Sequence, residues 1–368
     1  MNHDRRKLRS AGTIGLLAAL AIGGAITGVS QNRDPDVVTT LGSTVPNNGD
    51  VNPYGVARVP RTTGHLVQGQ FLVSNFNNAA NNQGTGTTIV QMSPNGKLQL
   101  FAQIDPGSVS CPGGVGLTTA LVAFQSGLVV VGSLPTTDGT AATAEAGCLL
   151  VLNSSGKVIM TISGKNINGP WDMAAYDAGD KFALFVTNVL NGTVAAKGRL
   201  VSRGTVVRLV FTVDDAGIPH MTDNTIIASG FPERTDPAAL VIGPTGVAFD
   251  PASGNLFVAD SLDNRIAVIP SALFRSDTAK TGSTLSSGGA LNDPLGMSFV
   301  SNRLFVTNGN DGRIIELDSQ TGQQLDADFA DTSGGPPPGA GALFGLWAVD
   351  TGTVYFVDDA VNTFNLLH

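Results

Sequence analysis

Beyond residue 50 the sequence repeats one loose pattern six times, and this repetition limits the fold more than any other feature. Each copy has an apolar stretch, a tight turn, a second apolar stretch that ends in a polar residue, and a third stretch. Successive end residues are separated by 58, 55, 72, 48 and 50 positions, which suits the four-stranded blades of a β-propeller. These polar end residues are Asn75, Ser133, Asn188, Asp260, Asn308 and Asp358.

The composition agrees with a protein made of strands and turns. The chain has 46 glycines among 368 residues, and only 14% of its residues are charged. Such a balance favours strands and tight turns over solvated helices. The net charge of −8 gives no basic surface for nucleic acid, so we expect no nucleic-acid partner.

The two ends of the chain are expected to close the ring together. The sixth copy ends at His368 and leaves no room for a fourth strand. Residues 36–41 contain the run Val-Val-Thr-Thr-Leu, which is typical of a strand. We therefore expect an all-β, six-bladed propeller of four-stranded antiparallel blades whose last blade is completed by this N-terminal strand.

The fourth and fifth copies carry a recognisable motif. Residues 244–250 read Pro-Thr-Gly-Val-Ala-Phe-Asp, residues 256–261 read Leu-Phe-Val-Ala-Asp-Ser, and residues 264–266 read Asn-Arg-Ile. This copy resembles an NHL repeat, and the next copy is similar, so the resemblance covers residues 243–320. It implies a six-bladed β-propeller. NHL propellers include both binding scaffolds and enzymes, so the resemblance does not choose a function.

The first thirty residues are expected to direct export. Four basic residues within positions 5–9 precede an uncharged stretch at 11–29, the pattern of a signal peptide. We expect residues 1–30 to be removed and residues 31–368 to form a single propeller domain in the periplasm or outside the cell. The alternative is an uncleaved membrane anchor, because nineteen uncharged residues just reach the length of a bilayer span.

Cys111 and Cys148 are the only two cysteines. In an exported protein an even pair is most simply a disulfide, which we predict here. Two separate free thiols are the alternative.

Unequal loops suggest which face of the ring is functional. The loops between second and third strands are long in blades one to three and short in blades four and five. Long loops on a rigid scaffold often carry binding sites. We therefore predict a monomeric, non-catalytic scaffold that binds a protein, glycan or small ligand on this face, and we consider catalysis the less favoured reading. A membrane partner is expected only if the N-terminal segment is uncleaved.

Five residues are candidates for a binding site near the channel mouth. Trp171 and Trp347 can form an aromatic floor for a ligand or pack between blades. The oxygens of Asn188, Asp260 and Asn308 can hold Ca²⁺ or bond the nearby backbone. We predict no resident cofactor, with calcium as the one possible ion, and we assign no catalytic residue.

The alternative function is a metal-dependent hydrolase or lyase with its site in the central channel. Six-bladed lactone hydrolases, which this chain resembles, hold a divalent metal with Glu, Asn and Asp. Asn188 and Asp260 match two of these ligands, but no first strand begins with Glu. The starts of the first strands hold Asn52, Pro53, Pro170, Pro244 and Pro294.

Overall fold

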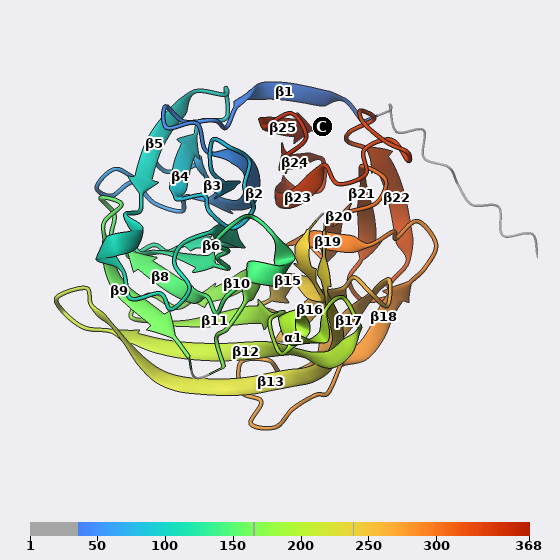
Figure 1. The fold of residues 1–368 in the computed structure, drawn as a ribbon. Helices are drawn as coiled ribbons and strands as arrows, with labels where there is room; N and C mark the ends of the chain where they lie inside the picture. The colour runs from blue at the N-terminus through green and yellow to red at the C-terminus, as the bar shows by residue number, and fades with distance from the viewer. Residues whose placement is uncertain (1–35, 165, 238) are drawn as a thin grey trace, which may run out of the picture. The chain divides into compact units, whose positions relative to one another are not determined.

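The strands of residues 36–368 pair into six β-sheets that are arranged in a ring (Figure 1). The structure is a computed structural model that describes these residues except 165 and 238. The predicted all-β, six-bladed architecture is confirmed, whereas the predicted signal peptide at 1–30 lies outside the described residues. Among the described residues, no helix is long and apolar enough to cross a membrane.

Each blade begins with an innermost strand beside the central channel, and the chain runs outward from it (Figure 1). Blade one comprises β2 (Val51–Arg58), β3 (Phe71–Asn77), β4 (Thr88–Met92) and β5 (Leu98–Gln103). Blade two comprises β6 (Leu117–Ala123), β7 (Val129–Ser133), β8 (Cys148–Leu152) and β9 (Val158–Ser163). Blade three comprises β10 (Pro170–Asp177), β11 (Lys181–Asn188), β12 (Val201–Val213), β13 (Pro219–Asp236) and β14 (Leu240–Ile242).

The remaining three blades have four strands each. Blade four comprises β15 (Pro244–Asp250), β16 (Asn255–Asp260), β17 (Arg265–Ile269) and β18 (Ser283–Ser287). Blade five comprises β19 (Pro294–Val300), β20 (Arg303–Asn308), β21 (Arg313–Asp318) and β22 (Gln324–Phe329). Blade six comprises β23 (Leu343–Asp350), β24 (Thr353–Asp358), β25 (Thr363–Leu367) and β1 (Val38–Ser43). Three short helical turns, η1 (Pro106–Ser108), η2 (Ala141–Thr143) and α1 (Thr193–Ala196), lie in loops.

The N-terminal strand closes the ring as predicted. β1 pairs antiparallel with β25, and Val38 lies opposite Leu367. The strand occupies Val38–Ser43, two residues later than the segment expected from the sequence. Joining the two ends of the chain in one blade removes the open sheet edges that an incomplete ring would expose.

Blade three departs from the sequence-based expectation. Residues 229–243, which connect blade three to blade four, are mostly strand, because β12 and β13 pair from Val201 opposite Glu233 to Val213 opposite Pro219 and β13 extends to Asp236. The chain then turns back and forms β14, which pairs with the end of β13. This fifth strand carries three buried apolar residues into the ring.

The innermost strands share an irregularity near their starts. In every blade the pairing between the first and second strands shifts register there, as between Pro294 and Met297. In blades one, three and five a hydroxyl of the second strand bridges this break. Thr307 Oγ1 accepts the Gly296 N–H at 2.8 Å and donates to the Phe344 carbonyl of the next blade at 2.8 Å. Ser74 and Thr187 bridge in the same way.

Glycine at this break lets adjacent innermost strands approach closely. A Cβ on Gly345 would lie 2.1 Å from the Tyr54 carbonyl oxygen, and a Cβ on Gly296 would lie 2.0 Å from the Phe344 carbonyl oxygen. Real Cβ atoms do not come this near to backbone, so these positions demand glycine. Glycine stands here in four of the six blades, at Gly55, Gly246, Gly296 and Gly345.

The predicted disulfide is present. Cys111 and Cys148 are bonded, with their Cα atoms 5.4 Å apart. The bond ties the crossover into blade two to the start of β8. It therefore restrains the loop of residues 134–147 between β7 and β8.

Substituting alanine for Gly345 should destabilise the ring where blade six meets blade one. The new methyl would collide with the Tyr54 carbonyl, and the expected loss is about 2–3 kcal/mol of unfolding free energy. Gly352→Ala is the matched control in the same blade, because its Cβ would meet only Asp350 Oδ1 at 3.8 Å. Thermal unfolding of both variants measures the difference. Equal melting temperatures would show that the close approach is unimportant.

Candidate active site in the central channel

The channel is closed by apolar side chains at one end. We call the face with the crossovers and the loops between second and third strands the crossover face, and the opposite face the turn face. At the crossover face Tyr54 stacks between Phe76 and Phe344, with ring centroids 4.6 and 4.0 Å apart. This channel plug also contains Trp171, Leu134, Ala144, Val189, Leu295 and the β14 residues Leu240, Val241 and Ile242.

The long loops in blades one to three have a structural role in the plug. Leu134 and Val189 begin two of these loops, and both side chains are buried in the plug. Trp171, one of the two candidate tryptophans, is buried there as well, with its ring 6.3 Å from that of Phe344. The loops on the crossover face thus contribute side chains that fill the channel.

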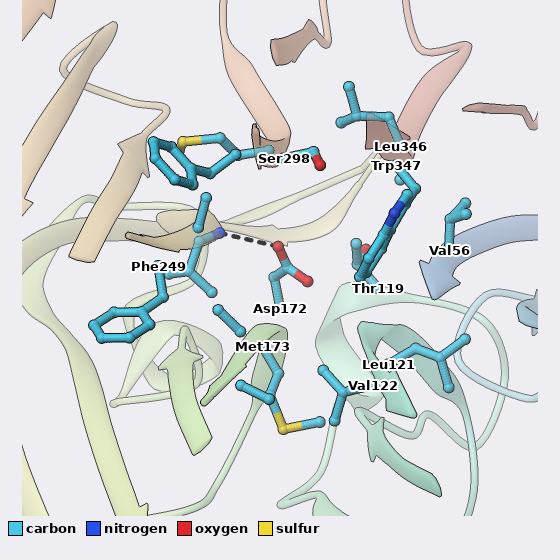
Figure 2. A pocket seen from close by; sticks show the side chains of 18 of the residues that line it. Val56, Thr119, Leu121, Val122, Asp172, Met173, Phe249, Ser298, Leu346 and Trp347 are labelled. Carbon is cyan, nitrogen blue, oxygen red and sulfur yellow. Dashed lines mark hydrogen bonds between the residues drawn. The ribbon is translucent and has the colours of Figure 1, made fainter. Parts of the chain in front are cut away.

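A cavity of about 230 Å³ occupies the channel on the other side of the plug (Figure 2). Its lining comes from the innermost strands of all six blades. Phe124, which directly follows β6, and Asp177, the last residue of β10, belong to the lining, so the cavity extends toward the turn face. The candidate Trp347 lines this cavity, so the two tryptophans that the sequence paired lie at different levels of the channel.

Asp172 is a buried carboxyl group in the wall of this cavity. Its Oδ2 accepts the Val247 N–H from the neighbouring blade at 3.0 Å, and the residue is 7% exposed. Burial raises the pKa of Asp172 to about 7, because the N–H groups of Val247 and Met173 only partly offset the cost of burying the charge. Figure 2 shows its second carboxylate oxygen on the side where Thr119 and Trp347 lie.

Asp172 occupies the position that glycine holds in four other blades. The third copy reads Pro170-Trp171-Asp172, where the fifth reads Pro294-Leu295-Gly296. A side chain at this position has to avoid the adjacent strand, and here it reaches the channel. Sequence reasoning missed Asp172 because it compared what the copies share. The signal that identifies it is the single carboxylate replacing the repeated glycine.

Thr119 is a second position where one blade departs from the pattern that the other blades share. In β6, three residues between the paired Leu117 and Leu121 lie opposite the single residue Gly132 of β7. In the other innermost strands only two residues lie opposite one residue of the second strand at this point, as in β19. Thr119 is 5% exposed and lines the cavity, and its buried Oγ1 has no hydrogen-bond partner within the described part of the chain. A buried hydroxyl without a partner is unfavourable unless a bound molecule uses it.

The polar candidates at the ends of the second strands lie outside the channel cavity, and each one is bonded to a residue of its own blade or of the segment leading into it. Asn188 accepts the Asn168 N–H at 3.1 Å, and Asn308 likewise accepts the Asn292 N–H at 3.1 Å. Asp260 forms an ion pair with Arg265 at 2.8 Å. All three are completely buried, and none lines the channel cavity.

These residues do not fit a metal centre. The carboxylate of Asp260 is engaged by a guanidinium, and the side-chain oxygen of Asn188 is engaged by backbone. Across residues 36–368, apart from the two left undescribed, no three His, Cys, Asp or Glu side chains are grouped so that they can hold a metal ion.

Comparison with known proteins supports the fold. No family model matches the sequence, and no curated protein matches it. Among solved structures, a gluconolactonase from Xanthomonas campestris is 12% identical, with 90% of this chain and 89% of that chain covered and a TM-score of 0.53. A glucose dehydrogenase is 14% identical with coverages of 90% and 98% and a TM-score of 0.55. A calcium-binding regucalcin from Agrobacterium tumefaciens is 11% identical with coverages of 89% and 93% and a TM-score of 0.52.

These similarities correct the functional prediction. A non-catalytic scaffold is contradicted, because the similar structures include a gluconolactonase, sugar dehydrogenases and a luciferin-regenerating enzyme. The expectation that catalysis is the less favoured reading is contradicted for the same reason. An enzyme agrees better with them. At 11–14% identity the likeness itself shows the fold, so the activity has to be argued from the residues.

The raised pKa of Asp172 makes a prediction about stability. The neutral carboxyl is favoured in the folded chain, so Asp172 stabilises the fold fully below its ordinary pKa of 3.8, and this contribution is lost as the pH rises through about 7. As the pH is raised from 4 to 8, the free energy of unfolding of Asp172→Asn should therefore increase by up to about 4 kcal/mol relative to that of the wild type. Chemical unfolding at several pH values measures this difference.

Asp318→Asn is the control of opposite sign, because the Thr321 N–H holds the pKa of Asp318 below its ordinary value, so this variant should lose stability relative to the wild type as the pH rises. Parallel pH curves for Asp172→Asn and the wild type would contradict the assignment of a raised pKa to Asp172.

Proposed function

We propose that this protein is a hydrolase of small neutral esters, with lactones as the leading class, and that the reaction takes place in the channel cavity. The observation that carries the proposal is the buried Asp172 carboxyl, which has a pKa of about 7 and lies in an otherwise mostly apolar cavity. A group with a pKa near neutrality can both accept and release a proton at physiological pH.

The ionised Asp172 acts first as a general base. The Val247 N–H holds Oδ2, which leaves the other oxygen to take a proton from a water molecule. That water attacks the ester carbonyl carbon, and the carbonyl oxygen gains negative charge as the new C–O bond forms. The unpartnered Thr119 hydroxyl is the side chain available to donate a hydrogen bond to this oxygen.

Asp172 then acts as a general acid. When the tetrahedral intermediate collapses, the ester C–O bond breaks and the alcohol oxygen leaves. The protonated carboxyl transfers its proton to that oxygen. The products are a carboxylic acid and an alcohol, joined in one molecule when the substrate is a lactone, and Asp172 returns to its ionised form.

The cavity wall selects the substrate class. Trp347, Phe249, Met173, Met297 and Leu346 present apolar surface to the cavity. A volume of about 230 Å³ is smaller than most drug-sized binding sites, so the ligand is a single small ring or short acyl chain. The apolar lining favours alkyl esters and alkyl lactones over substrates with many hydroxyl groups.

Substitution of Asp172 tests the proposal with a panel of alkyl lactones and short-chain esters. Asp172→Asn should lower kcat/KM by about 100-fold or more, because asparagine cannot accept the proton. In the wild type kcat/KM should rise with pH and reach half its maximum near pH 7, as Asp172 ionises.

Asp250→Asn is the control, because Asp250 lies at the end of β15, outside the cavity lining, and accepts the Ala252 N–H at 2.9 Å. It should keep both the rate and the pH profile. Unchanged hydrolysis by Asp172→Asn would refute this mechanism.

Two further assignments are supported by the same structure. We propose that the protein functions in the periplasm or outside the cell, which the disulfide supports because such bonds persist in oxidising compartments. We also propose that blades four and five derive from NHL-type repeats. The Asn-Arg-Ile motif supports this, since its Arg265 pairs with the buried Asp260 at the end of the second strand.

A further inference from the structure

The turn face carries large apolar side chains that are exposed to solvent. Val67 lies in the turn between the first two strands of blade one, and Val37 precedes β1 in blade six. Ile218 lies in the β12–β13 turn of blade three, and Phe274 lies in the β17–β18 loop of blade four. Blades six and one are opposite blades three and four in the ring, and Val37, Ile218 and Phe274 lie on the outer strands or outer turns of their blades, so these side chains are spread around the rim of the turn face.

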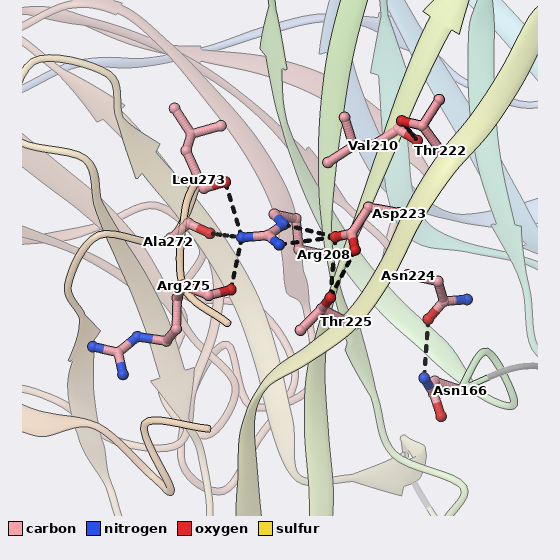
Figure 3. A network of polar contacts seen from close by, with 10 residues as sticks. All are labelled: Asn166, Arg208, Val210, Thr222, Asp223, Asn224, Thr225, Ala272, Leu273 and Arg275. Carbon is pink, nitrogen blue, oxygen red and sulfur yellow. Dashed lines mark hydrogen bonds and ion pairs between the residues drawn. The ribbon is translucent and has the colours of Figure 1, made fainter. Parts of the chain in front are cut away.

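Phe274 is the most exposed of them at 87%, and its loop is held rigidly. The Arg208 guanidinium, from β12 of the preceding blade, donates to the carbonyls of Ala272, Leu273 and Arg275 at 2.9–3.1 Å (Figure 3). Arg208 is itself fixed by Asp223 at 2.8 Å. The backbone on both sides of Phe274 is thus bound to a buried cation, which keeps the aromatic ring projecting outward.

Phe274 thus presents an apolar ring to solvent from a loop that is held in place. Its burial in a partner removes apolar surface from water, and the fixed loop loses little freedom when this happens. The support therefore favours binding.

We propose that the turn face docks flat on a lipid bilayer and inserts Phe274, Ile218, Val37 and Val67 at the level of the lipid headgroups. A bilayer is flat and wide enough to reach apolar side chains on opposite sides of the ring at once. The described chain also starts at this face, since β1 runs from beside the end of β25, and it follows the uncharged stretch at 11–29.

The charges indicate that apolar insertion, not attraction to anionic lipid, provides the affinity. The whole chain has a net charge of −8. In the Phe274 loop, Arg275 is paired with Asp277 at 3.2 Å. Attachment should therefore occur on zwitterionic lipid and change little with salt concentration.

Spin labels on the full chain test this surface directly. Phe274→Cys, Ile218→Cys and Val361→Cys each provide one new thiol, since Cys111 and Cys148 are bonded and buried. Val361 is the control, because it is 54% exposed in the β24–β25 turn on the crossover face. The measurement is the accessibility of each label to dissolved oxygen and to a water-soluble nickel chelate, on phosphatidylcholine vesicles.

With vesicles, the labels at 274 and 218 should show a severalfold higher ratio of oxygen to nickel accessibility than in buffer, whereas the label at 361 should not change. Unchanged melting temperatures verify that the variants are folded. Attachment through the N-terminal segment alone would leave all three labels equally accessible to nickel and would overturn the proposal, as would an absence of binding.

Discussion

The close approach of adjacent innermost strands is the constraint on which the rest of the ring depends. Hydroxyls of Ser74, Thr187 and Thr307 join the register break of one blade to a carbonyl of the next, at 2.7–2.8 Å. In blade four, where Ala259 replaces the hydroxyl, Thr245 on the innermost strand donates to the Pro294 carbonyl at 3.0 Å. Pro294 directly precedes Leu295, the residue equivalent to Phe344, so blade four reaches the neighbouring strand by a different residue and a different carbonyl. In each case a buried backbone group gains a partner, and leaving it unpaired would be costly.

This constraint also determines where chemistry can be placed. Glycine is required at the break wherever the neighbouring carbonyl leaves no room for a Cβ, as at Gly246 and Gly296. A functional side chain at the break either extends into the channel with the pairing unchanged, as Asp172 does, or follows a changed pairing, as Thr119 does in β6. Asp172 and Thr119 occupy these positions in neighbouring blades. The same backbone spacing that holds the ring together thus brings a carboxyl and a hydroxyl into one cavity.

The sequence predicted what depends on repetition and local chemistry. Six copies, turn residues and the missing last strand were sufficient for the blades and their closure, and an even pair of cysteines was sufficient for the disulfide. The open end of the channel could not be predicted in this way. The open end is the one that the plug leaves free, and the plug depends in part on β14. Leu240 of β14 adopts a left-handed backbone with φ of 63° and packs in the plug. Nothing in the repeat pattern indicates this fifth strand.

The Asp172 site could not be predicted from the repeat pattern, for a related physical reason. The pKa of Asp172 depends on its burial by residues from other blades, which are distant in sequence, and not on any neighbouring motif. The repeated polar residues were candidates because they recur. Asn188 and Asn308 each accept a backbone N–H from the segment just before the first strand of their own blade, so their recurrence serves the architecture. In a repeat protein, features shared by all copies mainly serve the architecture, and departures from the pattern indicate where to look for function.

The plug and the exposed apolar side chains give the two faces different roles. With the crossover face filled by Tyr54, Trp171 and Phe344, a ligand of the channel cavity has to approach from the turn face. A bilayer docked there would cover that approach, so a substrate would reach the cavity from the lipid side. Met173, Met297 and Trp347 give the cavity an apolar wall suited to a molecule that partitions into lipid. The proposed docking surface and the proposed substrate class are therefore chemically consistent, although they rest on different residues.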